Sequence, residues 1–234
     1  MDDTLTIPSI HVLVINLKRR TDRWKALNDH INEMKARHKL SFITSLHRIE
    51  GIDNPEHPGK GCMQSHANTI KLAKAQHWNN VMVVEDDVRF PHNVDEIVSG
   101  VMQESIATRW KVIFGASLRV NQREVGMLSP HLVFLKSRGI LTGTHCMIYN
   151  SLAYDEIISI IDNELTSTHP YHIDMLLCDK LNVAKSNVLL AVPFIGHFTP
   201  NDKSDVRVGK DTSNDYQQLV QTEHVACIIA KNVK

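Results

Sequence analysis

A chain of 234 residues that is 42% hydrophobic and 22% charged is long enough to bury a substantial core as one domain. Its 26 basic and 26 acidic residues cancel, so the net charge gives no reason to expect binding to nucleic acid or to an anionic membrane. The 4 cysteines include no CxxC pair, which excludes a zinc-finger spacing and a small disulfide framework and favours free buried thiols.

The first residues do not resemble a targeting signal. They begin with two acids and lack the basic-then-apolar order of a signal peptide. Apolar runs such as residues 189–195 are too short to span a bilayer. We therefore expect no transmembrane segment and a cytoplasmic location.

The first half of the chain alternates between predicted strands and helices. Strands are predicted at residues 11–17, 41–49 and 81–84, and helices at residues 21–37, 61–76 and 94–107. Thr21 and Asp22 are suitable caps for the first helix. Residues 54–61 contain two prolines and two glycines and are predicted to form a loop.

The second half is predicted to continue with short elements. Strands are expected at residues 111–114, 132–135, 145–149 and 188–192, helices at residues 152–161 and 173–181, and a helical tail after a polar segment at 199–214. Residues 120–130 are predicted to form a mobile loop. The alternation predicts an α/β fold with a mostly parallel central sheet flanked by helices. Ligands of such sheets bind beyond the carboxyl ends of the strands.

Three adjacent acids, Glu85, Asp86 and Asp87, follow the apolar strand at 81–84. Carboxylates held this close repel one another and raise each other's pKa. Helix capping or simple exposure to water explains one such acid well and three poorly. A divalent cation relieves the repulsion, and oxygen ligands suit Mg²⁺ or Mn²⁺ rather than Zn²⁺. We therefore expect a DxD-like metal motif that also contacts a diphosphate.

A basic cluster follows the first strand. Its arginines are Arg19, Arg20 and Arg23, and guanidinium groups form paired hydrogen bonds to phosphate. A solvated helix face is the alternative interpretation of such a charge run. The position after a strand favours phosphate or nucleotide contact. The sequence has neither a P-loop nor a GxGxxG motif, which argues against kinases, ATPases and dinucleotide-binding proteins.

Seven segments in order resemble glycosyltransferase family 25, which includes bacterial lipooligosaccharide galactosyltransferases and animal collagen galactosyltransferases. They are INLKRRTDR (15–23), GCMQSHANTIKLA (61–73), VMVVEDDVRF (81–90), WKVIFG (110–115), TGTHCMIY (142–149), HIDMLL (172–177) and GHFTPNDKSDV (196–206). The resemblance implies a GT-A fold in one catalytic domain over residues 1–234. A nucleotide-sugar-binding half is expected at about residues 10–115 and an acceptor-binding half at about 116–212, followed by a C-terminal tail.

The resemblance also assigns roles to the metal and nucleotide residues. Asp87, assisted by Glu85 or Asp86, is expected to hold Mn²⁺ or Mg²⁺, with His197 as a late ligand whose neutral imidazole suits that role. The nucleotide pocket is expected to contain Asn16, Arg19, Arg20 and Arg23. Without the resemblance, His197 is one of 14 histidines with no special role.

Further residues are expected to contact the acceptor or the donor. Asp174 lies among apolar neighbours that would desolvate its carboxyl group, and it is predicted to be the general base for the acceptor hydroxyl. Capping of a helix is the alternative role for Asp174. Ser65 and His66 are expected to position the sugar or the metal loop, and Thr142, Gly143 and Thr144 to line the donor pocket, with packing or turn roles as the equally suitable alternative. Ser204 and Asp205 match the SD element of the family and are also expected at the cofactor site.

The implied activity is transfer of a hexose from a nucleotide sugar, expected to be UDP-linked, to a hydroxyl of a glycan or glycoprotein. A direct displacement with inversion is expected, with retention as the alternative if Asp174 lies too far away. We expect neither the extra domain nor the retention signal of the animal enzymes, which favours a bacterial or viral glycan enzyme in a bacterial or virus-infected host cytoplasm. The alternatives are a nucleotide-sugar hydrolase, a nucleotidyltransferase, or a non-catalytic glycan-binding module on the same fold.

Overall fold

The structure is a computed structural model that describes residues 9–37, 39–184, 186–199, 205 and 213–231. Its helices are α1 (Thr21–Ala36), α2 (Pro58–Ala75), α3 (Val94–Ser105), α4 (Tyr154–Leu165), α5 (Ile173–Leu181) and α6 (Ser213–Lys231), with a short 3-10 helix η1 (Ser151–Ala153). Its strands are β1 (Ile10–Leu17), β2 (Ile43–Gly51), β3 (Asn80–Glu85), β4 (Val88–Arg89), β5 (Val112–Phe114), β6 (Val125–Ser129), β7 (Leu132–Leu135), β8 (Cys146–Asn150), β9 (Val188–Ala191) and β10 (His197–Phe198).

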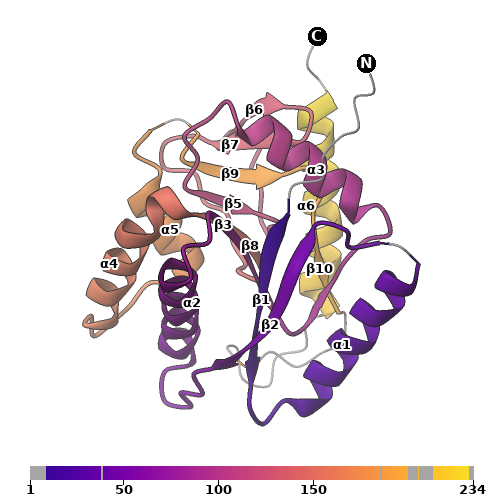
Figure 1. The fold of residues 1–234 in the computed structure, drawn as a ribbon. Helices are drawn as coiled ribbons and strands as arrows, with labels where there is room; N and C mark the ends of the chain where they lie inside the picture. Colours follow the sequence, from indigo (N-terminus) through magenta and orange to yellow (C-terminus); the bar gives the residue numbers. More distant parts are fainter. Residues whose placement is uncertain (1–8, 38, 185, 200–204, 206–212, 232–234) are drawn as a thin grey trace.

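Eight strands form one sheet in the order β2-β1-β3-β8-β5-β9-β7-β6. The pairs β1/β2, β1/β3 and β5/β9 are parallel, and β8 and β7 run against their neighbours. Most strands of the sheet therefore point in the same direction (Figure 1). This confirms the predicted α/β class with a mostly parallel sheet flanked by helices. A separate antiparallel ribbon joins β10 to β4.

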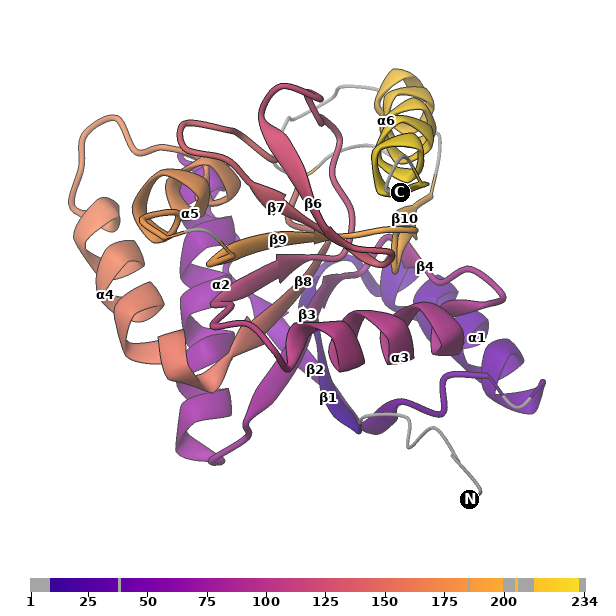
Figure 2. The same cartoon turned by 90° about the horizontal axis from the view of Figure 1, so that it is seen from above.

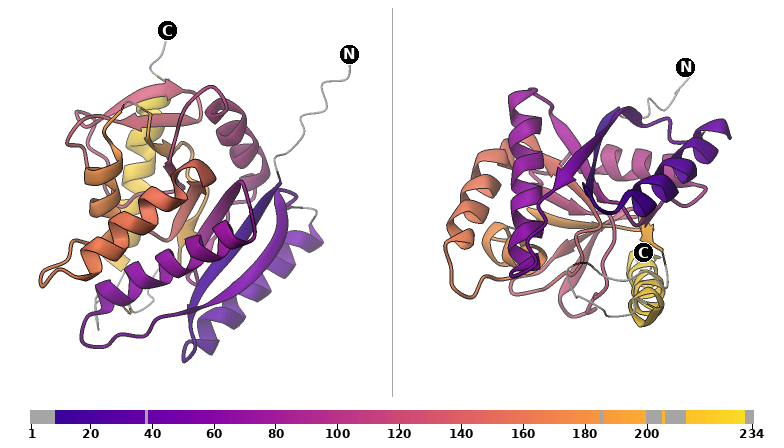
Figure 3. Two further views of the ribbon diagram at one scale, coloured as in Figure 1. Left: turned by 60° about the vertical axis from the view of Figure 1, so that its left-hand side comes forward. Right: turned by 90° about the horizontal axis from the view of Figure 1, so that it is seen from below.

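The helices cover both faces of the sheet, as Figure 2 shows. One core contains buried side chains of α2, α4, α5 and α6, and the other contains those of α1 and α3. Helix α6 packs against β6, β7 and β10 (Figure 3). No helix in the described ranges is both long enough and apolar enough to cross a bilayer.

Strand β3 shows why an unbroken apolar run forms a central strand. Val81 and Val83 contribute to the core under α2, whereas Met82 and Val84 contribute to the core under α1 and α3. All four side chains are fully buried. Successive side chains of a strand point to opposite faces, so a strand covered on both faces needs apolar residues at every position. The same alternation sets the directions of the acids that follow.

Three local expectations were wrong. The predicted loop at 120–130 contains β6, which pairs with β7 in an antiparallel hairpin. Helix α2 begins at Pro58 inside the predicted loop at 54–61, because proline is tolerated in the first helical turn. The N-cap of α1 is Arg20, and no side chain caps this helix, so neither Thr21 nor Asp22 has the expected capping role.

Candidate functional site

The candidate site lies where β1, β2 and β3 end. These strands are parallel, so their carboxyl ends meet at one edge of the sheet. Strand β8 is antiparallel to β3, so the segment that enters β8, residues 142–145, reaches the same edge. The topology thus brings four distant parts of the chain together.

Two neighbouring cavities open at this edge. The first cavity has a volume of about 550 Å³ and is lined by Ile15, Leu17, Arg19, Arg23, Ile52, Asp53, Asn54, Pro55, Pro58, Cys62, Ser65, His66, Glu85, Asp86 and Asp205. The second cavity has a volume of about 410 Å³ and extends over residues 142–145, the start of α5 and part of α6. Arg23, Cys62, Glu85 and Asp205 line both cavities, so these side chains form a shared wall.

The three adjacent acids do not face one point. Asp86 lies on the α1 face of the sheet, where Asn16 Nδ2 donates to its Oδ2 at 2.6 Å and Arg23 Nη1 lies 3.1 Å from its Oδ1. Burial raises the pKa of the Asp86 carboxyl, and the contacts with Asn16 and Arg23 oppose that rise. Asp86 therefore binds residues of the protein itself, and the predicted assisting metal ligand is already engaged.

Glu85 points to the opposite face, towards α2. The hydroxyl of Thr144 donates to its Oε1 at 2.6 Å. Burial raises the pKa of Glu85, and the negative charge of Asp87 raises it further. Glu85 and Asp87 both line the second cavity. Two carboxylates that disfavour each other's ionised form fit a hard divalent cation, which would offset their repulsion.

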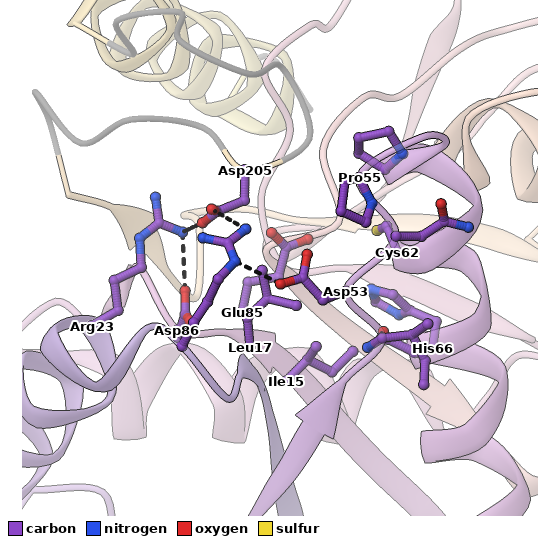
Figure 4. Close-up of a pocket in the computed structure, with 15 residues that line it drawn as sticks. Ile15, Leu17, Arg23, Asp53, Pro55, Cys62, His66, Glu85, Asp86 and Asp205 are labelled. Carbon is purple, nitrogen blue, oxygen red and sulfur yellow. Dashed lines mark hydrogen bonds and ion pairs between the residues drawn. The ribbon is translucent and has the colours of Figure 1, made fainter.

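The arginines converge on one carboxylate, that of Asp205. Nη2 of Arg19 lies 2.9 Å from its Oδ1, and Nη1 of Arg20 and of Arg23 lie 2.6 Å and 3.4 Å from its Oδ2. Arg19 also pairs with Asp53 at 2.6 Å (Figure 4). The structure thus brings the predicted arginine cluster together around an anion, as a phosphate-binding cluster requires.

Asp174 lies in the wall of the second cavity. Its Oδ2 accepts a hydrogen bond from the amide of Gly143 at 2.7 Å, and its Oδ1 accepts one from the amide of Met175 at 2.8 Å. Gly143 has a φ of 98°, a conformation that glycine adopts without strain. The alternative role of Asp174 as an N-cap is not observed, because the N-cap of α5 is His172. Two backbone donors therefore orient its carboxylate.

The structure places the other predicted site residues as follows. Ser65 accepts from the amide of Ile52 at 2.8 Å and so holds the segment between β2 and α2. Thr142 lines the second cavity with Gly143 and Thr144. His197 Nε2 lies 2.8 Å from Glu223 Oε2 of α6, and its side chain does not line either cavity. Ser204 lies outside the described residues.

Several residues of this edge had no predicted role. Cys62 was interpreted only as a free thiol, yet it lies in the wall between the cavities. His145 is buried in the second cavity and packs edge-on against Phe198, with ring centroids 5.5 Å apart. Burial lowers the pKa of His145 to about 4. Arg48 donates to Asn16 Oδ1 at 2.5 Å. His145 lies within the segment TGTHCMIY (142–149), so the resemblance could have pointed to it. No local pattern in the sequence marks Arg48.

Comparisons with known proteins show only distant similarity. No protein-family model and no curated protein matches the sequence, so the resemblance to glycosyltransferase family 25 is not confirmed. A glycosyltransferase involved in the glycosylation of the major capsid of PBCV-1 is 11% identical, over 70% of this chain and 72% of its own, with a TM-score of 0.43. Mannose-1-phosphate geranyltransferase from Thermus thermophilus is 9% identical, over 78% and 73%, with a TM-score of 0.39.

A third solved structure covers more of the chain. HddC from Yersinia pseudotuberculosis is 12% identical, over 91% of this chain and 99% of its own, with a TM-score of 0.38. All three TM-scores lie below 0.5. We therefore base the functional assignment on the site itself.

Proposed function

We propose that the protein is a metal-dependent glycosyltransferase that moves a hexose from a nucleotide sugar to a hydroxyl of a glycan or glycoprotein. The observation that carries this proposal is the pair of cavities with a shared charged wall. A transferase must hold a donor and an acceptor side by side, and the wall at Arg23 and Glu85 lies where the two would meet. The seven motifs that resemble glycosyltransferase family 25 support the same activity.

The first cavity is suited to the nucleotide. Ile15, Leu17 and Ile52 give it an apolar side for a base, and Arg19 and Arg23 give it a cationic side for phosphates. Its volume of about 550 Å³ lies within the range of small-molecule sites. UDP is the expected nucleotide through the family resemblance. In this arrangement the diphosphate replaces Asp205 as a partner of the arginines.

Asp87 and Glu85 would hold the metal ion, Mn²⁺ or Mg²⁺. A divalent ion supplies positive charge that offsets the charge developing on the departing nucleoside diphosphate. His197 stays a predicted ligand, although its imidazole pairs with Glu223. Arg19 and Arg23 of the first cavity stabilise the same diphosphate through charged hydrogen bonds.

The second cavity is suited to the acceptor. Asp174 takes the proton from the attacking hydroxyl, because its carboxylate lines this cavity and is held by two amides. The hydroxyl attacks the anomeric carbon as the bond to the diphosphate breaks. Attack from the side opposite the leaving group inverts the configuration.

A screen of nucleotide sugars with Mn²⁺ tests the proposal, with and without glycan acceptors. We expect sugar transfer by the wild type and a loss of at least about 100-fold in Asp87→Ala, because the variant lacks one carboxylate of the proposed metal site. Asp29→Ala, on the exposed face of α1, is the matched control. Donor cleavage that no acceptor accelerates would favour a hydrolase. Glycan binding without Mn²⁺-dependent nucleotide binding would favour a binding module.

A further inference from the structure

A sulfur, a nitrogen and a carboxylate oxygen lie together in the wall of the first cavity. The potential ligand atoms of Cys62, His66 and Glu85 all lie within 4.8 Å of one another. Cys62 and His66 are four residues apart on α2, so their side chains project from the same face of the helix. Glu85 ends β3 and points towards that face. Figure 4 shows Cys62 and His66 on the side of the cavity away from Arg23 and Asp86, with Glu85 between the two groups.

The imidazole of His66 is fully buried and incompletely hydrogen bonded. Its Nδ1 lies 3.0 Å from the hydroxyl of Tyr149, whereas its Nε2 has no hydrogen-bond partner among the described residues. A buried polar atom without a partner destabilises the fold. Coordination of a metal ion by Nε2 would remove that destabilisation. Tyr149 would then be the outer partner that fixes the orientation of the ring, as metal-ligating histidines require.

Thr144 contacts the other two proposed ligands. Thr144 donates its hydroxyl hydrogen to Oε1 of Glu85 and lies 3.9 Å from the sulfur of Cys62. It therefore orients the carboxylate and contacts the thiol. A tetrahedral ion with bonds of about 2.0–2.3 Å separates its ligand atoms by about 3.5 Å. Side-chain rotations that move these atoms by about 1 Å are enough to reach that geometry.

The thiol and the imidazole beside Glu85 favour a different metal from the one favoured by the carboxylate pair of Glu85 and Asp87. Thiolate and imidazole ligands suit Zn²⁺ and similar ions, whereas Mg²⁺ and Mn²⁺ prefer oxygen. We propose that Cys62, His66 and Glu85 form a binding site for a divalent transition-metal ion of the zinc type. All three side chains line the first cavity, so the fourth coordination position is open to that cavity. The site goes beyond the proposed glycosyltransferase activity, but it shares Glu85 with the metal pair proposed for that activity, so the two ions would compete for this carboxylate.

Cobalt binding tests this site directly. The full chain, treated with a chelator and without an affinity tag, is titrated with Co²⁺ alone, and the absorption spectrum is recorded. We expect one Co²⁺ per chain with a thiolate-to-cobalt charge-transfer band, and loss of that band when one equivalent of Zn²⁺ is added. Cys62→Ser should lose the band, because serine keeps the shape of the side chain and removes the thiolate. Cys227→Ser, a half-buried cysteine of α6, is the matched control and should keep it.

A second variant separates loss of a ligand from loss of the fold. His66→Gln should keep the cysteine and its band at saturating Co²⁺, with an affinity at least about tenfold weaker. Circular dichroism and the melting temperature verify that each variant is folded. Absence of the band in the wild type, or its persistence in Cys62→Ser, would overturn the proposal. No nucleotide sugar is present, so this outcome is separate from the test of the transferase activity.

Discussion

Arg23 and Asp86 form a buried ion pair, with Nη1 3.1 Å from Oδ1 and less than a tenth of either side chain exposed. Asn16 donates to the other oxygen of Asp86 at 2.6 Å, and Asn16 accepts in turn from Arg48. This network joins α1, β1 and β2 to the end of β3. A buried charge that keeps its partners is tolerated, whereas one that loses a partner is strongly destabilising.

Replacement of Arg23 is therefore expected to destabilise the fold. Arg23→Met leaves the carboxylate of Asp86 buried without its cation and should lower the free energy of unfolding by about 3–5 kcal/mol, measured by urea denaturation. Addition of Asp86→Asn should recover much of this loss. Lys25→Met is the matched control, since the Lys25–Asp29 pair is largely exposed and contributes about 0.5 kcal/mol or less. Equal effects of both methionine substitutions would contradict the role of the buried pair.

Gly143 is expected to be intolerant of a side chain. Its φ of 98° disfavours other residues, and a Cβ atom would lie 3.1 Å from Nδ1 of His145. Gly143→Ala should cost about 1–3 kcal/mol and displace the amide that orients Asp174. Gly59→Ala in α2 is the control, because its Cβ would meet His172 at an ordinary 3.7 Å. Thermal unfolding of both variants measures the difference, and a stable Gly143→Ala protein would contradict it.

Asp174 is expected to act on the reaction rather than on donor binding. Asp174→Asn keeps an oxygen for the amide of Gly143 and removes the basic carboxylate. Its kcat should fall by about 10²–10⁴-fold, with little change in the Kd for UDP. Steady-state kinetics and calorimetry measure the two quantities. Asp179→Asn, exposed on the same helix, is the control. A changed Kd with an unchanged kcat would assign Asp174 to binding instead.

Acid is expected to destabilise the protein through its buried histidines. Burial lowers the pKa of His66 to about 4, below its value of about 6.5 in the unfolded chain. Between pH 6.5 and pH 4 the unfolded state therefore binds more protons, so stability falls as the pH falls through this window, by up to about 3 kcal/mol for this imidazole. Urea denaturation at several pH values, with a chelator present, measures the slope. His66→Gln should make it shallower, and identical slopes would contradict the assignment.

The parts of the fold that were predictable are those specified by local patterns. β1 and β3 have apolar residues at nearly every position because both faces of each strand are covered. That pattern also predicted where the acids and the arginines would gather. β6 was missed because it is an edge strand whose only neighbour in the described sheet is β7, so pairing rather than composition determines it.

The site was predictable only where neighbours in the sequence are neighbours in space. Glu85 and Asp86 are adjacent in the chain, yet strand alternation sends them to opposite faces, which the cluster of charges alone did not reveal. The pair of Arg20 with Asp205 spans 185 positions, and the approach of Glu85 to Cys62 depends on how α2 packs on the sheet. Such contacts follow from tertiary packing and have no local signal.

The shared wall makes the two cavities energetically dependent on each other. Arg23 and Glu85 each present atoms to both sides, so a molecule that reorients them from one side changes the surface offered to the other. Thermodynamic linkage then requires that each occupant alter the affinity of its neighbour by the same factor. Donor and acceptor are therefore expected to bind cooperatively. Positive cooperativity would mean that Arg23 and Glu85, once oriented by the first ligand, favour binding of the second ligand, and negative cooperativity would mean that they oppose it.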